Sequence, residues 1–498
     1  MNDIKQIIEN AAERALKEMN VEGFSVSIVK DAETIYTGGF GFADSGTKEK
    51  MTDGHIMPIG SSSKAFTATG AIMLADEGKV DLDAPVREFM PRFRLSDPEA
   101  SASATLRDLL CHRTGLPRHD LLWICWGEVS RDELIFKALP HLPSSKSFRS
   151  VWQYQNFMYA ASGCAIEKLS GKSWEDFTRE RIFVPLAMGE SAFLTDDRES
   201  GKRYSVLYKP DKDGKNEPCV PEKAQMIGPA GSIASNARDM AQWLKFNLAK
   251  GKAGDGDGGN ALLSEKRFSE LFKPNIPYEL MPFDIPGVNR VGYGLGWFID
   301  SYRGYTRIDH GGNISGATAL VSLIPEKNIG VAILSNADGS AITYAIANII
   351  EDALLGLEAK TDWIAFYKGQ FDKLKKEGED SAEKFYKTKV DGKPMSHELS
   401  EYAGKFSHPG YGELEVVADE SASDPENRLS LKFHSLDAKL THMHYDIFYA
   451  DVYEMPLPAS FKTALDGTIE SISIQFEPGL PEFILFKRAP KPEEEKKE

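Results

Sequence analysis

The chain has 498 residues, which is too long for one compact core and predicts two or three domains. Its 59 basic and 75 acidic residues leave a formal net charge of -16, and no basic cluster offsets this acidity. An acidic surface repels phosphate backbones and anionic lipids, so neither nucleic acid nor a membrane is an expected partner.

The first 20 residues predict an amphipathic helix, because apolar residues recur at helical spacing among charged ones: Ile4, Ile7, Ile8, Ala11 and Ala15. A signal peptide has an unbroken apolar run instead, and no stretch of about 20 apolar residues could span a bilayer. We therefore expect a cytoplasmic protein. The four cysteines form no CxxC pair, so neither a zinc nor a redox site is indicated, and no cofactor or metal is expected.

Strand patterns lie at both ends of the first 356 residues, with helices between them. Strands are predicted at 24–29 and 34–41, helices at 65–78, 160–169 and 237–248, strands at 292–298, 306–309, 318–324 and 329–335, and a closing helix at 341–355. Chain ends that meet in one antiparallel sheet would satisfy both halves. The pattern predicts an α+β domain over 1–356, with a sheet flanked by helices and an α-rich region inserted.

The composition changes after this domain. Residues 357–397 are polar and lysine-rich, and predict a helical connector. Short strands separated by turn signals follow, at 412–417, 428–433, 439–443, 469–476 and 483–487. Evenly spaced short strands are typical of a small barrel or sandwich, which we place at 398–490. The charged segment 491–498 is expected to be disordered.

Ser61 and Lys64 form a Ser-x-x-Lys pattern at the start of the predicted helix at 65–78. Positions i and i+3 share a helix face, so the amine would point at the hydroxyl. A serine needs such a neighbour because its free hydroxyl is a poor nucleophile. The alternative is a plain serine N-cap. The similar spacing at Ser45 and Lys48 lies in a polar turn with no helix after it.

Two further groups could complete such a site. Tyr154 could act as a base near a lysine ammonium, and Asn156 could hold a substrate carbonyl. His310-Gly311-Gly312 precedes a predicted strand, and its glycines would allow a substrate to approach the backbone closely. Taken singly, Tyr154 could be a half-buried aromatic residue and His310 a turn histidine.

In their order along the chain, these three motifs resemble those of the penicillin-recognising serine hydrolases, which include class C β-lactamases, D-alanyl-D-alanine carboxypeptidases and D-aminopeptidases. The flanking segments 109–117, 293–297 and 334–336 are similar too, and the resemblance covers about residues 8–356. It implies the β-lactamase/transpeptidase-like fold. Residues 398–490 resemble the lipocalin-like barrel attached to some of these hydrolases.

The resemblance also implies roles for the candidate residues. Ser61 would be acylated, Lys64 and Tyr154 would share the proton transfers in an order left open, and His310 would close the site. The substrate-binding residues would be Asn156, which positions the amide, and Gly311, Gly312 and Asn313. The amides of Ser61 and Asn313 would form the oxyanion hole. Because all three motifs precede the connector, the chemistry is not expected to need the C-terminal strands.

The third motif departs from that of β-lactamases, which carry Lys-Thr-Gly there. A histidine is mostly neutral at pH 7 and attracts a substrate carboxylate less than a lysine does. Our first hypothesis is therefore a peptidase or amidohydrolase for short or D-amino-acid-containing peptides. A β-lactamase or carboxylesterase is the second hypothesis, and a non-catalytic scaffold the third. The partner would be a small-molecule or short peptide substrate, with assembly into a homo-oligomer left open.

Two other groups of residues have open roles. Trp123, Trp126 and Trp152 could line an apolar wall of the acyl pocket or could be ordinary core residues. His442 and His444 would face one way on a strand, as a metal ligand pair does, but no third ligand is evident. For these histidines we expect packing or hydrogen bonding rather than a metal.

Overall fold

The computed structural model describes residues 2–490 except 128, 197–200, 223, 255–259, 280, 420, 422–427 and 453–454. The segment predicted to be a disordered tail, 491–498, lies outside the described residues. Among the helices of the described chain, none has the length and apolarity of a membrane span.

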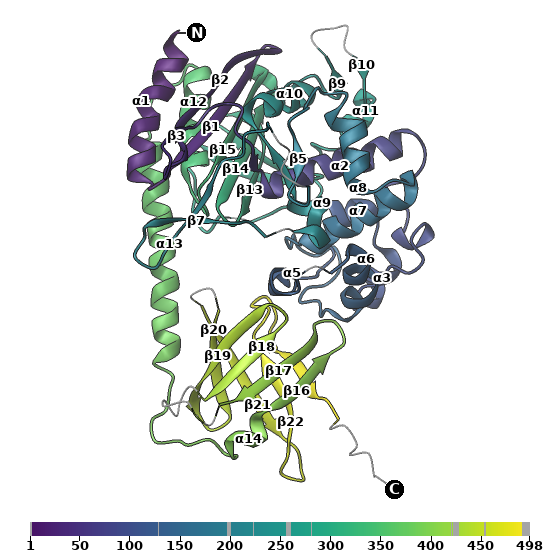
Figure 1. The fold of residues 1–498 in the computed structure, drawn as a ribbon. Helices are drawn as coiled ribbons and strands as arrows, with labels where there is room; N and C mark the ends of the chain where they lie inside the picture. Colours follow the sequence, from purple (N-terminus) through teal and green to yellow (C-terminus); the bar gives the residue numbers. More distant parts are fainter. Residues whose placement is uncertain are drawn as a thin grey trace.

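An antiparallel sheet is the centre of the first domain (Figure 1). Its strand order is β11-β12-β13-β14-β15-β1-β2-β3. The strands are β1 (Gly23–Lys30), β2 (Glu33–Asp44), β3 (Glu49–Lys50), β11 (Val288–Tyr293), β12 (Phe298–Tyr302), β13 (Tyr305–Ile314), β14 (Ala317–Ile324) and β15 (Ile329–Ser335). The pairing of β1 with β15 joins the two ends of the domain, which confirms the predicted α+β fold.

Helices cover both faces of this sheet. One face carries α1 (Asn2–Glu18), α12 (Ile342–Leu354) and the start of α13 (Trp363–Tyr386), and the other carries α10 (Ala237–Leu248). The α-rich region, which includes α2 (Ser63–Asp76) and α7 (Asn156–Ser170), adjoins the second face (Figure 1). Because both faces are covered, β15 is buried along its whole length, which explains its continuous apolar sequence.

Two predicted strands differ from the structure. Residues 292–298 form the end of β11, a turn and the start of β12, and the turn is closed by the Gly294 amide, which donates to the Trp297 carbonyl at 2.8 Å. Gly296 lies in this turn with φ +79°, outside the range of regular strand backbone. In contrast, the strand predicted at 306–309 continues to Ile314 and includes the whole glycine motif, because β14 pairs with it residue by residue.

The C-terminal strands close into an eight-stranded barrel. They are β16 (Gly404–His408), β17 (Gly412–Ala418), β18 (Leu429–Phe433), β19 (Leu436–His444), β20 (Ile447–Val452), β21 (Met455–Thr463), β22 (Ile469–Ile474) and β23 (Ile484–Arg488). Sequence patterns missed β16, β20 and β21. β21 was missed because it contains Pro456 and Pro458, and proline lacks the amide donor that strand pairing uses. In the structure, the Pro458 carbonyl still accepts a hydrogen bond from the Gln475 amide at 3.0 Å.

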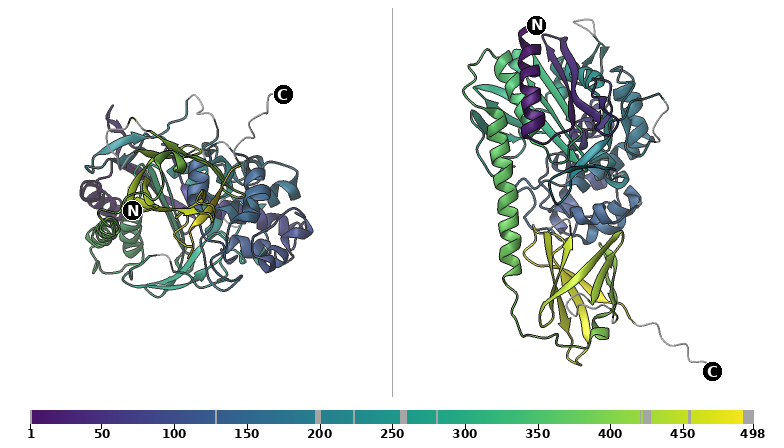
Figure 2. Two further views of the ribbon diagram at one scale, coloured as in Figure 1. Left: turned by 90° about the horizontal axis from the view of Figure 1, so that it is seen from below. Right: turned by 60° about the vertical axis from the view of Figure 1, so that its left-hand side comes forward.

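The barrel packs against the α-rich region of the first domain, and α13 runs down the side of that domain toward the barrel (Figures 1 and 2). The buried apolar side chains of the barrel and of the α-rich region form one continuous cluster. At the junction, the Ser435 amide and hydroxyl both donate to the Cys125 carbonyl, at 2.9 and 2.8 Å. The barrel is therefore joined to the rest of the protein by packing as well as by the connector.

Candidate active site

Ser61 lies in a short 3₁₀ turn, Gly60–Ser62 (η1), which leads directly into α2. The next residue is anchored to the sheet, since the Ser62 hydroxyl donates to the His310 carbonyl at 3.0 Å. Ser62 rather than Ser61 occupies the N-cap position of α2, so helix capping does not account for Ser61. Ser61 instead lines a cavity of about 500 Å³.

Lys64 Nζ lies 3.0 Å from Ser61 Oγ, and it also contacts Asn156 Oδ1 at 2.8 Å and the Ala230 carbonyl at 3.0 Å. The side chain is fully buried, and burial lowers the pKa of its amine well below the ordinary value, with the charge of Arg118 acting in the same direction. A neutral amine has two N–H donors and one lone pair, which match the two oxygen acceptors and the serine hydroxyl. This geometry suits a base that accepts the Ser61 proton.

Tyr154 precedes α7 and lies beside both Ser61 and Lys64. Its hydroxyl is hydrogen-bonded to Ser61, and its ring centroid is 4.6 Å from Lys64 Nζ. Burial raises the pKa of the phenol and outweighs the hydrogen bond with Ser61, which lowers it. Desolvation is the larger effect, so the site favours the protonated form of the phenol. A phenol that keeps its proton suits a donor better than a first base.

The glycines of the first and third motifs let the serine turn approach β13. A Cβ on Gly312 would lie 1.9 Å from the Ile59 carbonyl oxygen and 2.8 Å from the Ser61 nitrogen. Gly60 has φ +49°, and a Cβ there would lie 2.7 Å from the Asn313 nitrogen. The contact brings the backbones of Ser61 and Asn313 together, as an oxyanion hole made of two amides requires.

His310 faces the same cavity, but neither of its ring nitrogens is available. Nδ1 donates to the Gly311 carbonyl at 2.6 Å, so Nε2 is the acceptor of a hydrogen bond from the Tyr293 hydroxyl at 3.0 Å. The residue is 1% exposed, and burial, together with the nearby Lys64, lowers its pKa to about 3. His310 is a neutral packing group beside Tyr154, with ring centroids 6.3 Å apart.

Two site residues were not singled out from the sequence. Asp120 Oδ1 accepts from Asn156 Nδ2 at 3.0 Å, and Asp120 Oδ2 accepts from Arg118 Nε at 2.5 Å. The Arg118 guanidinium lies 4.9 Å from the Tyr154 ring centroid. Arg118 and Asp120 directly follow the segment 109–117, which is part of the family resemblance. Their place after Pro117 was therefore the sequence signal that could have indicated them as site residues.

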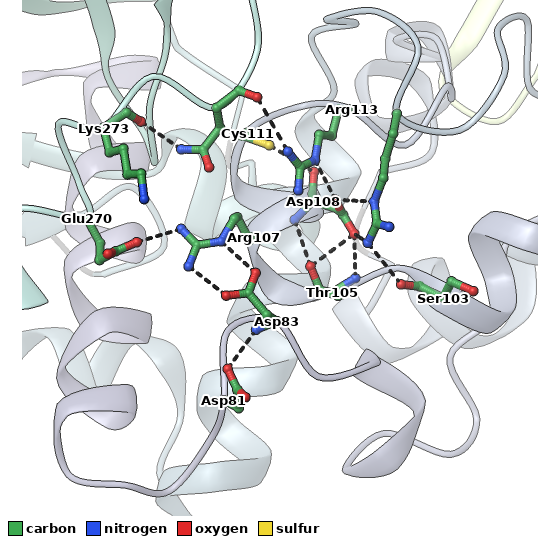
Figure 3. Close-up of polar contacts among 12 residues, drawn as sticks. Asp81, Asp83, Ser103, Thr105, Arg107, Asp108, Cys111, Arg113, Glu270 and Lys273 are labelled. Carbon is green, nitrogen blue, oxygen red and sulfur yellow. Dashed lines mark hydrogen bonds and ion pairs between the residues drawn. The ribbon is translucent and has the colours of Figure 1, made fainter.

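A buried carboxylate anchors the segments that lead to these residues (Figure 3). Asp108 is fully buried and accepts from Arg113 Nε at 2.5 Å and from Arg149 Nη2 at 2.6 Å. The Arg149 amide also donates to the Arg113 carbonyl at 2.8 Å. Burial alone would raise the pKa of Asp108, but the two guanidinium groups outweigh it and lower the pKa. This charged network ties the segment that carries Tyr154 to the segment before Arg118.

A second cavity, of about 1200 Å³, lies between the α-rich region and the barrel. It shares four lining residues with the Ser61 cavity: Arg118, Asp120, Ile124 and Tyr154. Most of its other walls are apolar, including Trp152 and, from the barrel, Leu457 and Phe476. The two cavities therefore adjoin at the candidate active site.

The remaining candidates have separate positions. Trp152 lines the larger cavity and Trp123 the smaller one, whereas Trp126 packs on His434 of the barrel with ring centroids 5.6 Å apart. In β19, His442 Nε2 donates to the Tyr445 carbonyl at 3.0 Å. His444 Nδ1 accepts from the backbone amide of residue 390 at 3.4 Å, so both histidines are hydrogen-bonded.

Comparison with known proteins places this architecture in a family. Residues 8–353 match the β-lactamase family, and residues 388–488 match a domain of unknown function, DUF3471. The chain is 27% identical over 505 residues to an unguisins hydrolase of Aspergillus campestris, which covers 96% of this chain and 90% of that protein.

Two solved structures are also similar. A D-amino acid amidase from Ochrobactrum anthropi shares 25% identity at a TM-score of 0.59, covering 71% of this chain and 98% of that one. An octameric penicillin-binding protein homologue from Pyrococcus abyssi shares 24% identity at a TM-score of 0.63, covering 96% and 99%.

The match over residues 8–353 shows that the chain belongs to the β-lactamase family. It is an enzyme of the serine hydrolase type, with a β-lactamase/transpeptidase-like domain followed by a closed barrel.

Proposed function

We propose that this enzyme forms an acyl-enzyme on Ser61 and hydrolyses amide bonds of short peptides, including peptides that contain D-amino acids. The observation that carries the proposal is the buried amine of Lys64, 3.0 Å from Ser61 Oγ and held there by two oxygen acceptors. Burial lowers the pKa of the amine well below its ordinary value, which favours the neutral form that can accept a proton.

In the acylation step, Ser61 Oγ attacks the substrate carbonyl carbon and its proton passes to Lys64 Nζ. The resulting oxyanion accepts hydrogen bonds from the amides of Ser61 and Asn313. The Tyr154 phenol then protonates the leaving nitrogen as the C–N bond breaks, and the Lys64 ammonium returns a proton to Tyr154. Asn156 holds Lys64 in position throughout.

In deacylation, a water molecule attacks the acyl carbon. One water proton passes to Lys64, and the hydroxyl oxygen bonds to the carbon. Ser61 Oγ then leaves and recovers a proton from Lys64, which restores the neutral amine and releases the carboxylic acid.

Two findings support a peptide-like substrate. The relatives named above include a D-amino acid amidase and an unguisins hydrolase. The larger cavity adjoins the Ser61 cavity and is mostly apolar, so it would accept bulky apolar side chains of a short peptide. In contrast, neutral His310 gives no charge for a substrate carboxylate, which disfavours β-lactams.

The test is turnover of D- and L-phenylalanine p-nitroanilide, a short p-nitrophenyl ester and nitrocefin, with Ser61→Ala as the blank. We expect hydrolysis of the anilide and the ester, little of nitrocefin, and fluorophosphonate labelling that disappears in Ser61→Ala. Preferential turnover of nitrocefin would support a β-lactamase instead. An unlabelled wild-type protein would support a non-catalytic scaffold.

We also propose that the protein assembles into a homo-oligomer, since the homologue from Pyrococcus abyssi, similar over nearly the whole chain, is described as octameric. Light scattering tests this, and a monomeric mass at micromolar concentration would exclude it.

A further inference from the structure

The segment Arg118-His119-Asp120 lies between the Ser61 site and the barrel, and its side chains contact both. Asp120 accepts from Asn156 Nδ2, and the same amide group, through Oδ1, accepts from Lys64 Nζ. Arg118 lies over the Tyr154 ring. Arg118 therefore contacts Tyr154 directly and Asp120 reaches Lys64 through Asn156, whereas the middle residue, His119, contacts the barrel.

His119 is fully buried, and two barrel residues bind it. Its backbone amide donates to the carboxylate of Glu477, and its ring Nδ1 lies 2.7 Å from the Tyr411 hydroxyl. Ring Nε2 lies 3.0 Å from the Pro143 carbonyl. A carbonyl only accepts, so Nε2 carries the proton, Nδ1 is the acceptor, and Tyr411 is the donor. The Pro143 carbonyl thus fixes the tautomer, and the barrel hydroxyl holds the orientation of the ring.

The backbone of His119 needs this support. Its φ is +50°, in the left-handed region that a residue with a β-carbon rarely adopts, and it is the residue before α5 (Asp120–Cys125). Such a conformation persists only where surrounding contacts determine it. A relaxed His119 would change the direction in which Arg118 and Asp120 leave the backbone.

The two barrel residues are themselves buried and held by further contacts. Tyr411 is fully buried and stacks on Phe476, with ring centroids 5.9 Å apart. Glu477 is 6% exposed and also accepts from the Gly479 amide at 2.7 Å. A contact made by fixed groups can hold its partner in one geometry, as the outer-shell partners of other functional sites do.

We propose that Tyr411 and Glu477 of the barrel are positioning residues for the Ser61 site. Through His119 they hold the segment 118–120 in the conformation in which Asp120 orients Asn156 and, through it, Lys64. This rests on the proposed acylation of Ser61. It also replaces the sequence-based expectation that the chemistry does not need the C-terminal strands.

Tyr411→Phe is the direct test, because it removes one hydroxyl and keeps the ring. We expect the acylation rate constant for a small activated ester, too short to reach the larger cavity, to fall about tenfold, with KM unchanged. Glu477→Ala should show a similar loss, and Glu477→Gln, which keeps an acceptor for the His119 amide, should recover most of it. The matched control is Ser435→Ala, which loses a hydroxyl contact at the same junction and leaves His119 untouched.

Hydrogen exchange over residues 112–125 measures the same coupling without turnover, and we expect faster exchange in Tyr411→Phe than in Ser435→Ala. The inference would be overturned if folded Tyr411→Phe had the acylation rate constant and the hydrogen exchange of the wild type. It would also be overturned if Ser435→Ala lost as much of the acylation rate constant as Tyr411→Phe. If wild-type Ser61 cannot be labelled while exchange responds as expected, the proposed function fails, and only the structural coupling between the barrel and the segment 118–120 is supported.

Discussion

Replacement of Lys64 by Met tests whether the buried amine is neutral. In the folded protein, burial lowers the pKa of Lys64 well below its ordinary value, whereas the unfolded chain binds a proton up to about pH 10.4. The unfolded state therefore binds more protons in the window between these two pKa values. Within this window the wild-type free energy of unfolding rises with pH, by up to about 1.4 kcal/mol per pH unit. Lys64→Met lacks this dependence.

If the amine is unprotonated in the folded protein at both pH values, the stability of the wild type relative to Lys64→Met should increase by about 2 kcal/mol between pH 8 and 9.5. The variant also leaves the Asn156 and Ala230 oxygens without a donor, at about 1 kcal/mol each, but this loss does not change with pH. Acylation should fall by about 10² to 10⁴-fold.

The assay is urea unfolding of both proteins at the two pH values, with fluorophosphonate labelling of Ser61 in parallel. Lys137→Met, at a side chain that is 70% exposed, is the matched control. A stability difference that does not change with pH would mean that Lys64 keeps its proton in the folded protein. The role of its neutral amine as the base would then be refuted.

Three further changes test the site. Tyr154→Phe should slow acylation strongly, and its double variant with Lys64→Met should lose little more than the worse single variant; a loss equal to the product of the two would refute a shared proton path. His310→Lys should lower the melting temperature, because the new ammonium would be buried; an unchanged melting temperature would contradict this. Gly312→Ala should reduce fluorophosphonate labelling of Ser61 at least 100-fold, because the added Cβ would displace the oxyanion hole. Gly189→Ala is the control, since a Cβ there has no neighbouring atom within 4 Å. Equal labelling of the two variants would disprove this role of Gly312.

The elements predicted best from the sequence are those whose local pattern agrees with their tertiary contacts. The helix at 237–248 and the strand at 329–335 have the predicted bounds, because each has an apolar face or run that packs directly on the sheet. β21 was missed because its prolines argue against a strand, and the end of β13 because of its two glycines. Pairing with neighbouring strands determines both, and pairing is not a local property.

In the candidate site, too, some residues could be predicted from local sequence patterns and others depend on tertiary contacts. Spacing and family resemblance indicated Ser61, Lys64 and Tyr154, which the structure brings together around one hydroxyl. Asp120 and Arg118 were not singled out, because their place after Pro117 was the available signal and their importance comes from contacts with residues far away in the chain. Protonation states were equally inaccessible, since burial determines them and burial is a property of the folded chain.

The proposed chemistry depends on the removal of charge around Lys64. His112 and His310 are neutral because burial lowers the pKa of both, so neither adds a cation beside the amine. The nearby charges of Arg118 and Asp120 form an ion pair and oppose each other in their effect on the lysine. A developing oxyanion is then stabilised mainly by backbone amides, whose dipoles are fixed before the reaction begins. A lysine in the third motif would introduce a cation into this neutral environment, so its replacement by histidine is consistent with a base that must stay unprotonated.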